Sequence, residues 1–124
     1  MSNEREMLMC AYREFDARNI DAVLAFMHPE VKWANGMEGG HVFGKEAVRT
    51  YWTRQFEMLN PHVEPVRIDK IDDNLFLAEV HQVVCDLRGN LLVDTVVYHT
   101  YQIHSGLIER MDITQGKPNS PHEN

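Results

Sequence analysis

A tryptophan and a carboxamide stand side by side at the start of a glycine-rich turn. Val31, Trp33 and Asn35 alternate along a short strand-like segment and therefore share one face, and glycines 36, 39 and 40 follow directly. An amide buried beside an indole costs free energy unless it finds hydrogen-bond partners. The pair indicates either a satisfied core or a ligand pocket, and Asn35 has the further option of bonding the turn backbone.

Three side chains in the second half of the chain could transfer protons. Glu79 and His81 are two residues apart in a strand pattern, so they project from one face and could form an acid/base pair. His99, close to Tyr98 and Tyr101, could donate a hydrogen bond or move a proton near neutral pH. Each also has a purely structural interpretation, as a satisfied half-buried histidine or a salt-bridged carboxylate. A single β-bulge would reverse the face that Glu79 and His81 share.

Other catalytic patterns are weak or missing. The glycines between positions 36 and 44 lack GxGxxG spacing and follow no βαβ pattern, so a phosphate site has little support. The seven histidines form neither HExxH nor a Cys/His quartet. There is no GxSxG, and neither Cys10 nor Cys85 has a base beside it in sequence. We therefore expect no metal and no cofactor.

Composition narrows the class of protein further. The 124 residues are enough for one domain with one core. A formal charge of -7 repels phosphate backbones, so no nucleic-acid partner is expected. No apolar run reaches the roughly 18 residues of a membrane span, and the charged N-terminus does not resemble a secretory signal. The two cysteines are far apart and fit a reducing compartment, which predicts a cytoplasmic location.

The pattern of apolar residues predicts helices first and strands afterwards. Helical spacing covers residues 4–18, a short segment 20–28 capped by Asn19 and ended by Pro29, and residues 45–59. Strand patterns cover residues 31–35 and 41–43, and four long runs at 63–71, 75–87, 91–103 and 107–113 are separated by turn residues. This order predicts an α+β domain over residues 1–114, with a flexible C-terminal tail at 115–124.

Three motifs carry a resemblance to a known family. RNIDAV at 18–23, GKEAVR at 44–49 and GLIERM at 106–111, in this order of elements, resemble the nuclear transport factor 2-like superfamily and its SnoaL-like / ketosteroid isomerase-like branch. The resemblance spans about residues 4–114. It implies a cone-shaped α+β barrel, in which three N-terminal helices pack on a strongly curved, mostly antiparallel sheet. It also implies an apolar cavity inside the cone and a homodimer through the outer sheet face.

The resemblance also implies roles for particular positions. The base of the isomerases falls on Asn35, and a carboxamide cannot accept a substrate proton as a general base. Their hydrogen-bonding acid falls on His99, and their tyrosine falls on Ala11, one residue before Tyr12. In SnoaL-like cyclases an Asp works with a His or Arg partner, but the matching inward positions of the last strand include Met111 and no carboxylate. The steroid isomerase route is therefore not expected.

Two functions stay open at this point. In the first, a cofactor-independent isomerase, cyclase or hydrolase acts on a small molecule that is hydrophobic, carbonyl-bearing or polycyclic. His99 is its acid/base or oxyanion donor, and His81 with Glu79 forms a second proton relay. In the second, a non-catalytic ligand-binding or dimeric assembly module keeps the cavity without the carboxylates. Both use the same predicted substrate-binding residues, which are Trp33, Asn35, Trp52, Tyr12, Tyr101 and Met111.

Overall fold

A computed structural model describes residues 3–117, and in this part of the chain helices precede a six-stranded sheet. The predicted tail begins with residues 115–117, which form no helix or strand, and its remainder lies outside the described residues. The elements are α1 Asn3–Asp16, α2 Ile20–Leu24, β1 Met27–Ala34, β2 His41–Phe43, α3 Lys45–Met58, β3 Leu59–Asp72, β4 Leu75–Asp86, β5 Leu91–His104 and β6 Leu107–Thr114.

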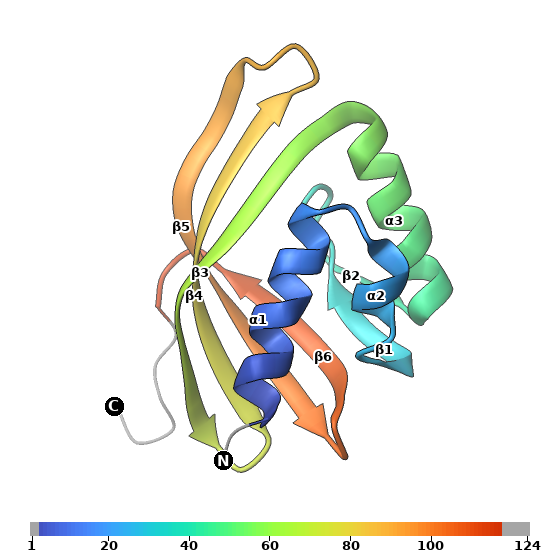
Figure 1. Cartoon of the computed structure of the whole chain (residues 1–124), viewed down its shortest axis with the longest axis vertical. Helices are drawn as coiled ribbons and strands as arrows, with labels where there is room; N and C mark the ends of the chain where they lie inside the picture. Colours follow the sequence, from blue (N-terminus) through green and yellow to red (C-terminus); the bar gives the residue numbers. More distant parts are fainter. Residues whose placement is uncertain (1–2, 118–124) are drawn as a thin grey trace.

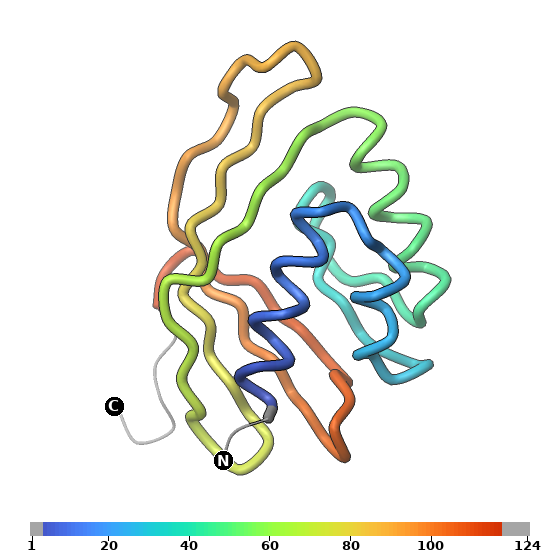
Figure 2. Tube along the Cα trace, in the orientation of Figure 1, coloured from blue at the N-terminus to red at the C-terminus, as the bar shows by residue number. Residues whose placement is uncertain are grey.

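The sheet is strongly curved and mostly antiparallel. Its strand order is β2-β1-β6-β5-β4-β3, and the pair β1 and β6 is parallel while the other neighbours are antiparallel. Figure 1 shows the sheet bending around α1, with α2 and α3 on the same concave side. The trace in Figure 2 shows the β4–β5 hairpin extending past the connection between α3 and β3. The predicted α+β cone is confirmed.

The first strand begins earlier than the sequence predicts. Residues up to 28 carry a helical pattern, but α2 ends at Leu24 and β1 starts at Met27. Met27 is fully buried and pairs with Ile108 of β6, whose N–H donates to the carbonyl of Phe26. Pro29 falls in the irregular part of this pairing, where a residue without an N–H is tolerated because the ladder is interrupted there. Tertiary pairing with a distant strand thus overrides the local helical pattern.

Two other local expectations also change. Asn19 does not cap α2 through its side chain, which donates instead to a carboxylate oxygen of Glu14 at 2.6 Å. The strand β3 starts four residues before the predicted position, because Leu59 and Pro61 already pair with Asp86 and Val84 of β4. Helix α3 ends at Met58, one residue before its predicted end, and the chain passes directly into an extended conformation that proline tolerates.

The core fills the concave side of the sheet. Ala78 and Val80 of β4 are fully buried on this inner face, whereas Glu79 and His81, which alternate with them, are half-buried on the outer face. The homodimer predicted through the outer face remains a prediction. None of the helices within residues 3–117 is both long enough and apolar enough to cross a membrane.

Candidate functional site

A cavity of about 260 Å³ lies between the helices and the concave face of the sheet. Its walls come from all three helices and from β1, β3, β4, β5 and β6, so it depends on the curvature of the whole sheet. Residues far apart in sequence meet here. The predicted residues that line it are Tyr12, Trp33, Trp52, His99, Tyr101 and Met111.

Aromatic rings form a rigid part of this wall. The indoles of Trp33 and Trp52 meet edge to face, with ring centroids 5.4 Å apart. Trp33 also contacts Tyr101, and Phe15 meets Trp52 at 5.2 Å. Edge-to-face pairs of this kind stabilise one arrangement of the rings beyond their burial alone. The apolar part of the cavity is therefore shaped before any ligand enters.

A chain of three hydrogen-bonding side chains crosses the buried end of the cavity. The hydroxyl of Tyr101 donates to the hydroxyl oxygen of Tyr12 at 2.7 Å. Tyr12 keeps its own hydroxyl proton, and its oxygen lies 2.7 Å from Nδ1 of His99. No other described residue accepts the hydroxyl proton of Tyr12, so we assign Tyr12 as the donor and Nδ1 as an unprotonated acceptor. A neutral imidazole with a free Nδ1 carries its proton on Nε2, so the two tyrosines select one tautomer of His99.

Burial keeps all three groups uncharged at neutral pH. Desolvation lowers the pKa of His99 from 6.5 to about 4. Burial also raises the pKa of Tyr12 and of Tyr101, because a phenolate would lose its hydration in this environment. At pH 7 the site thus presents a neutral imidazole, which can donate from Nε2 but is a poor proton acceptor.

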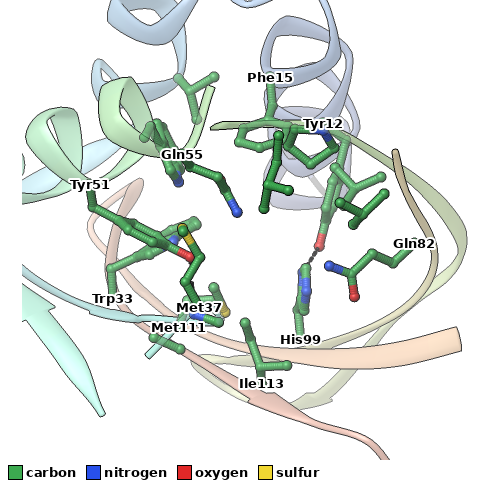
Figure 3. A pocket seen from close by; sticks show the side chains of 18 of the residues that line it. Tyr12, Phe15, Trp33, Met37, Tyr51, Gln55, Gln82, His99, Met111 and Ile113 are labelled. Carbon is green, nitrogen blue, oxygen red and sulfur yellow. Dashed lines mark hydrogen bonds between the residues drawn. The ribbon is translucent and has the colours of Figure 1, made fainter. Parts of the chain in front are cut away.

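Nε2 of His99 opens onto the cavity. Within residues 3–117, no buried side-chain nitrogen or oxygen lacks a hydrogen-bond partner, and no described residue bonds Nε2. Nε2 must therefore reach open space, and the cavity is the space that this ring lines. Figure 3 shows the imidazole joined to Tyr12 on one side of the cavity, with Gln82 beside it. The arrangement offers an N–H donor to a molecule inside.

A second polar group faces the first across the cavity. Tyr51 and Gln55 of α3 lie on the side opposite His99 (Figure 3). The hydroxyl oxygen of Tyr51 accepts the N–H of Gly36 at 3.0 Å. Tyr51 was not predicted as a site residue, because it fits the apolar stripe of its helix. Gln82 left a clearer signal, as a polar residue on an otherwise apolar strand face.

Asn35 does not line this cavity. Its side-chain oxygen accepts the N–H groups of Met37 and Glu38, each at 3.0 Å, and so closes the turn between β1 and β2. Strand β1 ends at Ala34, so alternation no longer places Asn35 on the face of Trp33. The structure thus corrects the expected position of Asn35 and matches the alternative in which the amide bonds the turn backbone.

Glu79 and His81 also lie outside the cavity. They project together, as alternation predicts, but from the outer face of β4, where Nε2 of His81 pairs with the carboxylate of Asp94 at 2.6 Å. The register of β4 and β5 is regular from Leu75 to Val84, so no bulge brings them inward. This corrects the predicted placement of an acid/base pair beside the ligand.

Among the described residues 3–117, the cavity wall carries no charged side chain. None of its lining residues is Asp, Glu, Lys or Arg, and its polar groups are neutral amides, hydroxyls, indoles and one imidazole. Within residues 3–117, no group of three or more His, Cys, Asp or Glu side chains is arranged to hold a metal ion. The site therefore favours an uncharged ligand, because an ion would lose its hydration without gaining a counter-charge.

An α+β cone with a neutral, aromatic cavity can bind many kinds of small molecule, so the fold alone does not indicate one activity. The model of the SnoaL-like domain matches residues 11–111, and the chain belongs to this family. The family lies within the nuclear transport factor 2-like superfamily, as the resemblance predicts. No curated protein sequence matches the chain.

Several solved structures share the fold. TerC crystallised with polyporic acid is 22% identical, with 90% of this chain and 89% of that chain covered and a TM-score of 0.78. SalBIII, an epoxide hydrolase/cyclase-like enzyme in pyran ring formation in the polyether salinomycin, is 15% identical, with 94% and 95% covered and a TM-score of 0.77. A Mycobacterium tuberculosis protein in complex with estradiol-17beta-hemisuccinate is 17% identical, with 86% and 88% covered and a TM-score of 0.73.

Proposed function

We propose that the protein binds a small, uncharged and largely apolar molecule with a carbonyl group, and that Nε2 of His99 donates a hydrogen bond to the carbonyl oxygen. The observation that carries this proposal is the chain Tyr101–Tyr12–His99, with both hydrogen bonds at 2.7 Å. It keeps Nδ1 occupied and leaves the Nε2 proton for the ligand. Two proteins of the same fold have been crystallised with small molecules, TerC with polyporic acid and the mycobacterial protein with estradiol-17beta-hemisuccinate.

Cavity size and charge narrow the ligand further. Pockets for drug-sized ligands commonly measure about 300–1,000 Å³, so a cavity of about 260 Å³ suits a body of one or two rings. The indoles and Met111 supply apolar and aromatic contact to that body. A carboxylate or an amine would meet no opposite charge on the wall, which favours ketones and similar neutral carbonyl compounds.

The chemistry that suits this geometry is polarisation of a carbonyl. A neutral imidazole that donates a hydrogen bond stabilises negative charge developing on the carbonyl oxygen. This helps an adjacent C–H to lose its proton to solvent water, which returns a proton to another carbon of the enolate, or helps an internal hydroxyl to add to the carbonyl carbon while its proton passes to the carbonyl oxygen. With a pKa of about 4, His99 is mostly unprotonated at pH 7 and a weak base, so donation is its stronger role. Cofactor-independent isomerisation or cyclisation of a carbonyl compound is the reaction class proposed.

A non-catalytic binding module is the second candidate. It is favoured by a specific observation, namely that no carboxylate of the described part of the chain lines the cavity and that Asn35, at the position of the isomerase base, closes a turn. The two candidates share the bound carbonyl and differ in turnover. Exchange of deuterium into the carbon next to a bound ketone, followed by NMR, separates them, since only the enzyme accelerates it.

Binding can be tested with a matched pair of probes. The only two tryptophans of the chain both line the cavity, so their fluorescence reports its occupancy. We expect 2-acetylnaphthalene to bind more tightly than 2-isopropylnaphthalene, which has the same shape without the oxygen. The change His99→Leu should weaken the ketone roughly 2- to 10-fold and leave the hydrocarbon nearly unchanged.

The control for that experiment is His81→Leu, because His81 lies on the outer face of the sheet. It should leave the affinity for both probes unchanged. Equal affinity of the two probes for the unaltered protein would contradict the proposal, and so would an equal loss of both on His99→Leu. Calorimetry on the same samples provides an independent affinity.

A further inference from the structure

The cavity holds a second hydrogen-bond donor that the proposed function does not use. Tyr51 lines the cavity from α3, on the side opposite His99 (Figure 3). Its hydroxyl oxygen accepts the N–H of Gly36 at 3.0 Å, which leaves the hydroxyl proton to be donated. No residue among 3–117 accepts that proton. Burial raises the pKa of Tyr51, so the hydroxyl stays protonated and remains a donor at neutral pH.

The turn next to Tyr51 also has hydrogen bonds of its own. The side-chain oxygen of Asn35 accepts two N–H groups of the turn. The backbone of Asn35 also bonds Gly40 and Gly39, each at 2.9 Å. Four hydrogen bonds therefore close the turn without Tyr51. The hydroxyl proton of Tyr51 is therefore available to a molecule in the cavity.

On the sheet side, the wall between the two donors is apolar. The side chains of Trp33, Met111 and Ile113 line this part of the cavity. Figure 3 shows Met111 and Ile113 along the sheet side, with Tyr51 and His99 at either side of the space. A ligand that satisfies both donors must therefore carry its polar atoms at its two ends and an apolar body between them.

From these contacts we infer that the ligand has two oxygen acceptors at opposite ends of an apolar ring body, one bonded by His99 and the other by Tyr51. This inference rests on the proposed function and narrows its substrate class from carbonyl compounds to neutral compounds with a second terminal oxygen. Tyr51 is then a specificity-determining residue. Gln55 lies beside it on the cavity wall and adds an amide that can adapt to the same oxygen.

The test compares two probes of the same shape. One is 2,6-diacetylnaphthalene, with a carbonyl at each end, and the other is 2-acetyl-6-isopropylnaphthalene, with a carbonyl at one end only. We expect the first to bind more tightly to the unaltered protein, by roughly 2- to 10-fold for one added neutral hydrogen bond. The change Tyr51→Phe should remove that difference and leave the affinity for the second probe nearly unchanged.

Tyr98→Phe is the matched control, because Tyr98 is a half-buried tyrosine that does not line the cavity. It should preserve the preference for the two-carbonyl probe. If the two probes bind equally to the unaltered protein, or if Tyr51→Phe weakens both by the same factor, the inference is overturned and the proposed function stands. If neither probe binds, the proposed function itself fails, and the inference fails with it.

Discussion

His99 and His81 lie on neighbouring strands of one sheet and have opposite surroundings. His99 projects from the inner face of β5, is only 8% exposed, and has a pKa lowered to about 4 by burial. His81 projects from the outer face of β4, where its side chain is 42% exposed and pairs with Asp94. The difference teaches that the face of the strand decides which of two like residues can meet a ligand.

The same contrast holds for two tyrosines of β5. Tyr101 is 3% exposed on the inner face, where it contacts the rings of Trp33, Tyr12 and His99. Tyr98 lies on the outer face and is half-buried. In both pairs, the residue on the inner face of the sheet belongs to the site and the residue on the outer face does not.

The largest expected effect comes from removing one ring on each face. Tyr101→Ala should lower the free energy of unfolding by about 3–5 kcal/mol, because it leaves a cavity in packed surroundings and removes a hydrogen bond to Tyr12. Tyr98→Ala should cost at most about 1 kcal/mol, the size of a cross-strand pair. Urea denaturation measures both. Similar losses for the two variants would mean that the faces do not differ as described.

A smaller effect separates the two histidines by pH. In the folded protein His99 has a pKa of about 4, against 6.5 in the unfolded chain, so the unfolded state binds more protons between these values. Stability should therefore be fully present above pH 6.5 and fall by about 3 kcal/mol as the pH drops to 4. The measurement is the free energy of unfolding at pH 7 and at pH 4, compared between variants.

His99→Gln should lose this part of the pH dependence, and His81→Gln should keep it. Carboxylates such as Asp112, whose pKa is lowered by Arg110 and His41 although burial opposes the shift, contribute equally in both variants and cancel in the comparison. An identical pH profile for the two variants would contradict a buried, neutral His99.

Much of the fold follows from the sequence because its apolar periods are long and regular. The helices α1 and α3 and the four long strands appear close to their predicted ranges. The start of β1 at Met27 does not, since it depends on pairing with Ile108, and no local pattern encodes that contact. The start of β3 at Leu59 also depends on tertiary contacts, because its first residues pair with β4.

The site was only partly predictable for a related reason. Residue type and spacing indicate a core or pocket position for Trp33, and the resemblance to the isomerases places His99 in the cavity and their tyrosine one residue before Tyr12. The bond between Tyr12 and Tyr101 joins residues 89 positions apart. Asn35 looks like a strand residue and in fact begins a turn, because β1 ends one residue earlier. Side-chain roles that depend on the last residue of a strand, or on which face is concave, need the folded sheet.

The central claim is that His99 is neutral at pH 7, with its proton on Nε2 facing the cavity. Long-range ¹H–¹⁵N correlation of the imidazole tests it most directly, because the two nitrogens give distinct shifts for each tautomer and for the charged ring. The account predicts a protonated Nε2 and an unprotonated Nδ1 at pH 7, unchanged down to pH 5, with the Nε2 signal shifted by 2-acetylnaphthalene. A charged ring at pH 7, or a proton on Nδ1, would contradict it.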